Sequence, residues 1–111
     1  MIRKKEAERI FEMYIFHVTY TAPDRETILQ FWDALCKANI AARTQAEPGN
    51  GEYHYYFPAE PGRENQLFLV ECWPTKEALI AHQEYDHFKE MGELKKQFNL
   101  ETRLVKYKIP D

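Results

Sequence analysis

The sequence lacks most features that would mark a disulfide-bonded, membrane-spanning or nucleic-acid-binding protein. Its 111 residues include only 2 cysteines and 4 glycines. No apolar run approaches the roughly 18 residues that a membrane-spanning helix requires. The net charge is −3, so there is no excess of basic residues to attract nucleic acid or anionic lipid. We therefore expect neither a nucleic-acid partner nor a membrane partner.

The cysteines and the N-terminal segment predict the cellular location of the protein. Cys36 and Cys72 form no C-x-x-C pair and no metal-ligand spacing, so we expect both to be reduced and buried in an intracellular protein. Residues 1–12 are charged and contain no apolar stretch of the secretory type. They are expected to form an N-terminal extension, either solvated or docked on a partner subunit. One domain should follow over residues 13–111, in the cytoplasm.

Common cofactor and metal motifs are also missing. The chain has no G-x-G-x-x-G, no phosphate-binding P-loop and no G-x-S-x-G. Neither H-x-x-x-H nor H-x-H occurs among the four histidines, which are His17, His54, His82 and His87. We expect no metal site and no cofactor. Any chemistry must then come from His, Glu, Tyr and Trp side chains. The high aromatic content, 14%, suits either a dense core or a pocket for a flat apolar ligand.

The residue pattern predicts an α+β protein with the element order β-α-β-β-α-β. Aromatic and β-branched residues at 14–21 indicate the first strand. Helical periodicity then runs from about 24 to 45, up to a Pro-Gly-Asn-Gly turn. The remaining elements are strands at 52–57 and 66–73, a helical region that Thr75 opens as N-cap, and a strand at 102–109. This is the ferredoxin-like arrangement, a four-stranded antiparallel sheet with helices on one face.

The two inner strands of this sheet also predict a homodimer. Residues 14–21 and 66–73 are largely apolar or aromatic on both faces, yet helices cover only one face. If this sheet face were uncovered, its apolar patch would be larger than the apolar patches that a monomer normally exposes. We therefore expect two copies to pack through their sheet faces about a two-fold axis.

One series of motifs resembles the antibiotic biosynthesis monooxygenase family over residues 14–107. It consists of Glu47-Pro48-Gly49, Tyr53, the run Phe68 to Leu79 that contains Glu71-Cys72-Trp73, then His82 and His87-Phe88. The resemblance implies a dimeric α/β-barrel fold. It also implies a cofactor-independent monooxygenase that oxidises a quinol or related small aromatic with O₂. The family also includes isomerase-like enzymes of small oxygenated metabolites and members without assigned function, so a non-catalytic ligand-binding or stress-response dimer is a further alternative.

Three residues are candidates for acid–base chemistry: His82, His17 and Glu71. His82 lies on the helix face that should meet the sheet, where it is either a general base or a structural histidine. His17 would share its cavity if its strand face meets the helices; otherwise it belongs to the core or an interface. Glu71 would hold an imidazole in one tautomer, or pair with Arg103.

Five aromatic residues are candidates for substrate binding: Trp73, Tyr53, Tyr55, Trp32 and Phe31. Trp73 points to the same side of its strand as Glu71 and is either a stacking wall or, as we favour, part of the core. Tyr53 and Tyr55 are expected mainly to pack, with one hydroxyl in the pocket. Trp32 and Phe31 would form its floor.

Overall fold

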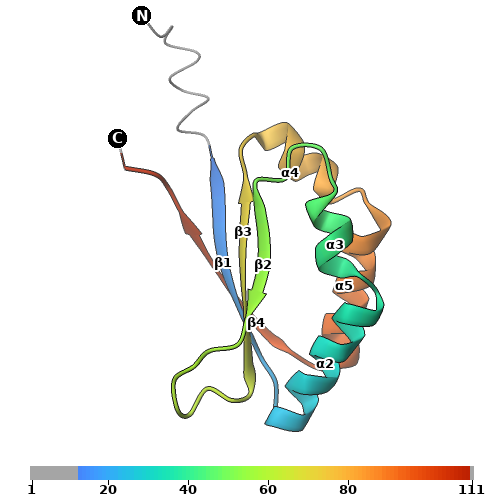
Figure 1. Ribbon diagram of the computed structural model, residues 1–111, viewed down its shortest axis with the longest axis vertical. Helices are drawn as coiled ribbons and strands as arrows, with labels where there is room; N and C mark the ends of the chain where they lie inside the picture. The colour runs from blue at the N-terminus through green and yellow to red at the C-terminus, as the bar shows by residue number, and fades with distance from the viewer. Residues whose placement is uncertain (1–12, 111) are drawn as a thin grey trace, which may run out of the picture.

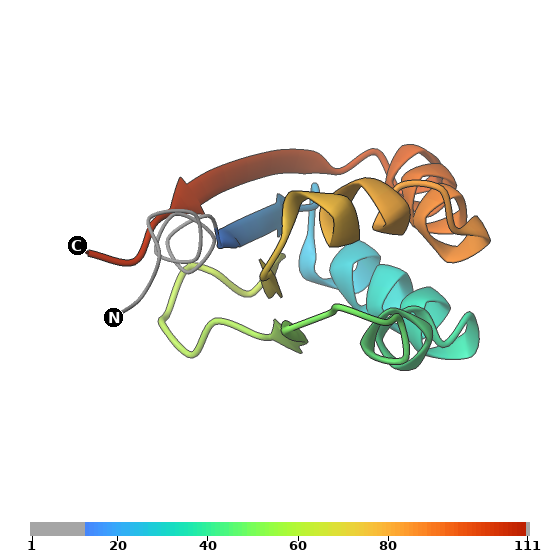
Figure 2. The same cartoon turned by 90° about the horizontal axis from the view of Figure 1, so that it is seen from above.

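The computed structural model describes residues 13–110 and confirms the predicted α+β, ferredoxin-like architecture. The elements are β1 (Tyr14–Thr21), α2 (Arg25–Lys37), α3 (Ile40–Gln45), β2 (Glu52–Tyr56), β3 (Gln66–Trp73), α4 (Lys76–His82), α5 (Asp86–Gln97) and β4 (Glu101–Tyr107). The strands form an antiparallel sheet in the order β2-β3-β1-β4. The four helices within residues 13–110 lie on one side of it (Figures 1 and 2). The predicted extension, residues 1–12, lies outside the described residues.

The orientation of β1 decides which of its side chains face the helices. Val18 and Tyr20 point toward the helices and are buried in the core. His17 alternates with them and therefore lies on the opposite face, where its ring contacts Phe68 and Tyr107. The prediction that His17 could share a cavity with His82 is wrong for this reason.

The long helix predicted over residues 24–45 is in fact two helices. Asn39 adopts a left-handed conformation, with φ of 53°, between α2 and α3. Asparagine tolerates this region better than most residues, so the chain turns here without glycine or proline. Thr75 caps α4 as predicted, because its hydroxyl accepts a hydrogen bond of 3.1 Å from the Ala78 amide.

The core lies between the helices and one face of the sheet. Its largest fully buried side chains come from both layers: Trp73, Phe31, Ile28, Leu35, Ile40, Leu67 and Leu69. The prediction that both cysteines are buried is wrong. Cys36 is exposed beyond the apolar stripe of α2, and Cys72 is only partly covered because it points to the helix-free face of the sheet.

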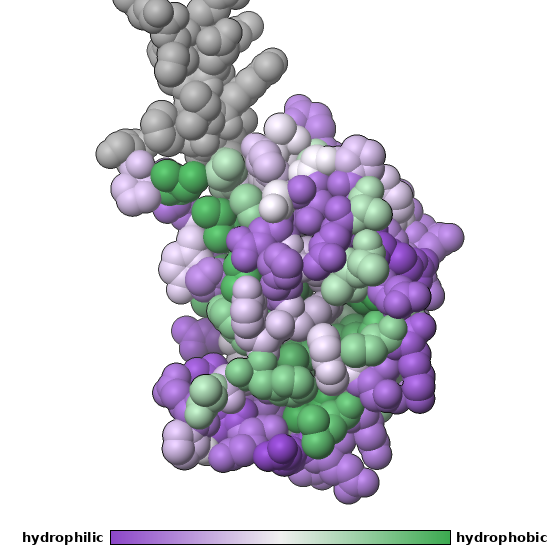
Figure 3. Space-filling model, viewed as in Figure 1, coloured by the Kyte–Doolittle hydropathy of each residue, from purple (hydrophilic) through white to green (hydrophobic). Residues whose placement is uncertain are grey.

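That helix-free face carries apolar and aromatic side chains. Ile15, Phe68 and Val70 are only half-buried there, and Tyr107 remains 47% exposed. Hydrophilic residues predominate along the outer side of the helices (Figure 3). Within residues 13–110 no helix combines the length and the apolar character needed to cross a membrane.

Candidate active site

A cavity of about 400 Å³ opens between the sheet and helices α4 and α5. Most of its wall is apolar or aromatic, and several polar side chains interrupt it. The apolar and aromatic part of the lining includes Phe16, Val18, Tyr20, Ile40, Tyr53, Leu79, Phe88 and Met91. The polar and charged part includes Thr44, Glu71, His82, Gln83, His87, Lys95 and Thr102. A mainly apolar cavity with a few convergent polar groups is typical of a small-molecule site.

A tight turn brings Glu47 beneath α4. The turn follows α3 and is closed by a hydrogen bond of 3.2 Å from the Asn50 amide to the Glu47 carbonyl. Gly49 has φ of +89°, and a Cβ at this position would lie 2.9 Å from the Cβ of Ala78. Only glycine lets the turn pass this close to the helix in this conformation. The close packing places the Glu47 side chain directly beside His82.

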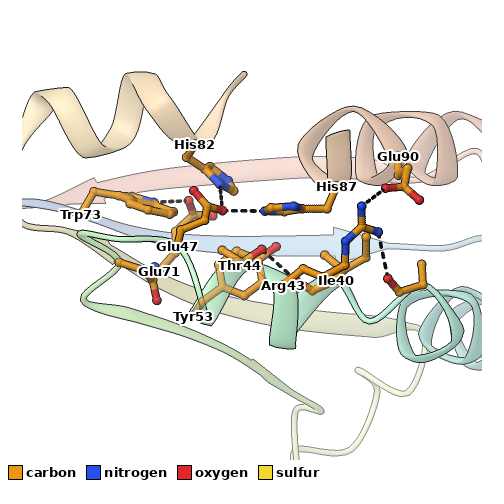
Figure 4. A network of polar contacts seen from close by, with 12 residues as sticks. Ile40, Arg43, Thr44, Glu47, Tyr53, Glu71, Trp73, His82, His87 and Glu90 are labelled. Atoms are coloured by element: carbon orange, nitrogen blue, oxygen red, sulfur yellow. Dashed lines mark hydrogen bonds and ion pairs between the residues drawn. The ribbon is translucent and has the colours of Figure 1, made fainter. Parts of the chain in front are cut away.

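Glu47 joins two histidines in a buried network (Figure 4). Its Oε2 lies 2.7 Å from Nδ1 of His82 and 2.6 Å from Nε2 of His87. The three side chains are 2%, 7% and 6% exposed, respectively. His82 ends α4 and His87 lies in the first turn of α5, so the turn between these helices directs both rings toward one carboxylate.

With Glu47 as a carboxylate, the network assigns one tautomer to each histidine. A carboxylate only accepts hydrogen bonds, so Nδ1 of His82 and Nε2 of His87 must both carry a proton. In neutral His82 the other nitrogen, Nε2, is then the proton acceptor. This nitrogen makes no hydrogen bond to any side chain or backbone group within the described chain, and His82 lines the cavity. The arrangement is that of a general base held by a carboxylate.

Two aromatic rings pack against His82, and a second carboxylate, Glu71, holds one of these rings. The ring of His82 stacks on Trp73 with a centroid distance of 4.4 Å, and the edge of Phe88 approaches it at 5.1 Å. The Trp73 indole N–H donates a 2.8 Å hydrogen bond to Glu71 Oε1. Burial raises the pKa of Glu71, against smaller opposing effects from the Trp73 hydrogen bond and the neighbouring His82.

The tyrosines near Glu71 are neutral hydrogen-bonding groups. The hydroxyls of Tyr53 and Tyr55 are 2.7 Å apart. Burial, and to a lesser extent the negative charge of Glu71, raises the pKa of Tyr20, Tyr53 and Tyr55 above its ordinary value. Tyr20 and Tyr53 line the cavity, so they can offer a protonated hydroxyl to a ligand.

The structure brings together some of the predicted site residues and separates others. His82, Glu71 and Tyr53 line the cavity, and Tyr55 reaches it through its hydrogen bond to Tyr53. Trp73 is fully buried behind His82 as part of the core, as we favoured.

Two of the predicted floor residues lie elsewhere. Phe31 is fully buried against Tyr20 and Phe98, and Trp32 packs against Tyr55 and Phe57. Neither residue lines the cavity, so the prediction that they form its floor is wrong. The reason is the direction of α2, whose inner face meets the core beside the cavity. The pairing of Glu71 with Arg103 is not found either, because Glu71 faces the helices whereas Arg103, opposite Thr19 in the sheet, points to the helix-free face.

The sequence reasoning missed Glu47 and His87 as functional candidates. Both belong to the motif series that carries the family resemblance, Glu47 in the Glu-Pro-Gly turn and His87 before Phe88. The Glu-Pro-Gly turn was the available signal for Glu47, because it is one of the motifs on which the resemblance rests. Its separation from His82 by 35 positions hid the contact.

Comparison with known proteins agrees with the fold. The family model of the antibiotic biosynthesis monooxygenases matches residues 13–94. A proposed antibiotic biosynthesis monooxygenase from Caulobacter crescentus has a similar structure, with a TM-score of 0.74, 17% identity, and coverage of 98% of this chain and 100% of that chain. A conserved protein from Methanosarcina mazei has a TM-score of 0.71 and 26% identity, over 94% of this chain and 98% of its own.

A third similar structure is described as an oxygenase. SnoaB from Streptomyces nogalater, a cofactor-independent oxygenase, has a TM-score of 0.66 and 12% identity, over 89% of this chain and 94% of its own. No curated protein matches the sequence. These structures share the ferredoxin-like fold of this chain. Because the family model covers most of its length, the chain belongs to the antibiotic biosynthesis monooxygenase family.

Proposed function

We propose that this protein is a cofactor-independent monooxygenase that oxidises a quinol or a related small aromatic with O₂. The observation that carries the proposal is the state of His82. One of its ring nitrogens is held by a buried carboxylate, and the ring borders an aromatic cavity. Family membership supports monooxygenase chemistry in general. The cytoplasmic location remains a prediction from the sequence.

The proposed reaction begins with proton removal by His82. Nε2 takes a proton from a substrate hydroxyl, and the imidazolium that forms faces Glu47 on one side and the Trp73 ring on the other. Both neighbours attract a cation, so the charge created in this step is stabilised. The substrate anion is then electron-rich enough to pass one electron to O₂.

Combination of the resulting radical pair forms the new bond between a ring carbon and oxygen. A quinol and one O₂ give a hydroxyquinone and one water. One oxygen atom stays on the ring, the other leaves in the water, and the substrate supplies all four electrons. The protein contributes deprotonation, orientation and a cavity with little water. Glu71 and the hydroxyl of Tyr53 are placed to hold a second polar group of the substrate.

The two alternative functions make different demands on this site. A non-catalytic ligand-binding dimer would fill the cavity with its own side chains or satisfy His82 with backbone groups. Here the cavity has about 400 Å³, and among the described residues the polar partner of His82 is the side chain of Glu47. An isomerase would use the same base without oxygen, so the oxygen requirement separates it from the oxygenase.

Oxygen uptake with a panel of small quinols tests the proposal. We expect His82→Ala to lower the rate by at least about 100-fold, the usual contribution of a general base. His17→Ala and the control His54→Ala should keep the wild-type rate, because both residues lie on the other face of the sheet. Equal rates in wild type and His82→Ala would refute the role of His82. Turnover without oxygen would favour the isomerase.

We further propose that the active form is a homodimer in which the helix-free sheet faces of two copies pack together. Val70 lies at the centre of this face, next to His17 and His54 in neighbouring strands. A lysine there would place a charge in the interface, so Val70→Lys should sediment as a monomer. Leu29→Lys, on the outer surface of α2, is the matched control and should remain a dimer. A monomeric wild type would contradict the proposal.

A further inference from the structure

We propose that Glu47, His82 and His87 also form a binding site for one divalent first-row transition-metal ion of the zinc type. This inference rests on the geometry of the cluster and not on the oxygenase activity proposed above. In residues 13–110 these three side chains form the one group of histidine, cysteine and carboxylate residues that brings three ligand atoms within 4.8 Å of one another. The sequence predicted no metal site, because the ligands come from three separate segments.

The ligand atoms already converge on one point. Nδ1 of His82 and Nε2 of His87 both point at Oε2 of Glu47, at 2.7 and 2.6 Å. A zinc ion with bonds of about 2.0–2.1 Å holds tetrahedral ligand atoms roughly 3.3 Å apart. The three atoms therefore need shifts of only about 1 Å to surround an ion in place of the two bridging protons. The side chains sit at the end of α4, the start of α5 and a turn, where such shifts disturb little regular structure.

The donor set indicates which ions would bind. Two imidazole nitrogens and one carboxylate oxygen are the ligands of many zinc sites and suit cobalt, nickel and copper as well. Magnesium and calcium prefer oxygen ligands and would compete poorly. Three protein ligands leave a further coordination position for water or another small ligand.

An independent feature of Glu47 also points to a missing partner. Its second oxygen, Oε1, is buried and has no hydrogen-bond partner in the described structure. Within residues 13–110 no lysine or arginine forms an ion pair with the Glu47 carboxylate. The ionisable side chains that contact it are the two histidines. A buried carboxylate oxygen without a partner is costly, and an ion bound by the carboxylate would remove that cost.

Metal binding would also change what His82 can do. An ion on Nδ1 replaces the proton there, so the proton of neutral imidazole moves to Nε2. That nitrogen then donates and can no longer accept a proton from a substrate. The metal-bound form should therefore be inactive in the proposed oxygenase reaction. This consequence, unlike metal binding itself, rests on the proposed function.

The test uses zinc and cobalt ions alone, added to full-length protein that has been dialysed against a chelator. Calorimetry should show one zinc ion per chain, and the melting temperature should rise with zinc because the ion binds the folded state. The cobalt form should give the visible absorption of a low-symmetry site, and X-ray absorption should show two imidazole ligands.

Matched variants locate the site. The double variant His82→Ala/His87→Ala should bind zinc at least about 100-fold more weakly, whereas His17→Ala/His54→Ala removes the same number of histidines and should bind like wild type. Glu47→Gln keeps the shape of the side chain and should also weaken binding, which covers the case in which the double variant does not fold. Failure of wild type to bind, or loss of binding in the His17/His54 variant instead, would overturn the site.

The two proposals fail in different ways. Zinc binding by a protein that never consumes oxygen supports the metal site and refutes the oxygenase. Oxygen uptake by a protein that binds no zinc refutes the metal site alone. If both are found, one equivalent of zinc should abolish oxygen uptake; full activity of the zinc-loaded protein would refute the inhibitory consequence.

Discussion

Gly92 offers a way to fill the cavity without touching its polar residues. It lies in α5 and lines the cavity. A Cβ at this position would meet no atom within 4 Å, and the glycine has no positive φ. A larger side chain can therefore be added here without backbone strain. We predict that Gly92→Ala and Gly92→Leu stabilise the protein while the leucine variant loses activity.

The size of the gain follows from the helix and from the open space. Replacing glycine by alanine inside a helix contributes about 0.5–1 kcal/mol. The three further carbons of leucine would be partly buried in the cavity, and each fully buried methylene contributes about 0.8 kcal/mol. Gly92→Leu should therefore gain up to about 2–3 kcal/mol. Because about 1 kcal/mol corresponds to about 4 °C in a domain of this size, the melting temperature should rise by several degrees.

Activity should move in the opposite direction. The leucine side chain takes space that an aromatic ring would occupy, and a misfit of this kind costs at least about tenfold in kcat/KM. Thermal unfolding at one fixed protein concentration and oxygen uptake measure the two effects. Lys89→Leu is the control, since it places the same side chain on the exposed side of α5. A Gly92→Leu variant that is destabilised, or that is as active as wild type, would refute the assignment of this cavity.

Two further predictions concern residues around the site. Burial raises the pKa of Glu71 in the folded state. The contribution of Glu71 to the free energy of unfolding is therefore largest at pH values below its pKa in the unfolded chain, and it is lost as the pH rises through its pKa in the folded state. Glu71→Gln keeps an acceptor for Trp73 and should melt higher than wild type at pH 7, with a difference that shrinks toward about pH 4; a pH-independent difference would contradict this reasoning. Gly49→Ala should cost about 2 kcal/mol, from the positive φ and from contact with Ala78. Gly62→Ala shares the positive φ but meets no atom within 4 Å, so equal losses of stability in the two variants would show that the contact is unimportant.

The fold was predictable because its local signals agree with one another. The strand at 66–73 has the same limits in the sequence pattern and in the structure, since a strongly apolar run between polar loops has clear ends. The N-cap at Thr75 could also be read directly, because a capping hydroxyl acts on an amide three residues away. The break at Asn39 could not be read in this way. Helical periodicity continues across it, and only the packing of α3 against the core selects the left-handed conformation.

The candidate site was predictable only in part. Glu71 and Trp73 share a side of β3, which alternation alone establishes, and the indole does bond the carboxylate. The sequence could not predict the sheet face to which His17 points, because β1 is apolar or aromatic on both faces and either face could have met the helices. The carboxylate that orients His82 was expected to be Glu71 and is Glu47, because a contact across 35 positions leaves no local pattern in the sequence.

The sequence by itself therefore determined the order of the elements, the alternation of side chains along each strand and the family to which the chain belongs. These properties depend on neighbours within a few residues, where spacing fixes geometry. Only the tertiary structure decided that Glu47, His82 and His87 meet. A glycine that admits close approach of a turn to α4 and a sharp turn between α4 and α5 bring them together. Contacts across 35 and 40 positions depend on how whole elements pack, and no local pattern records that packing.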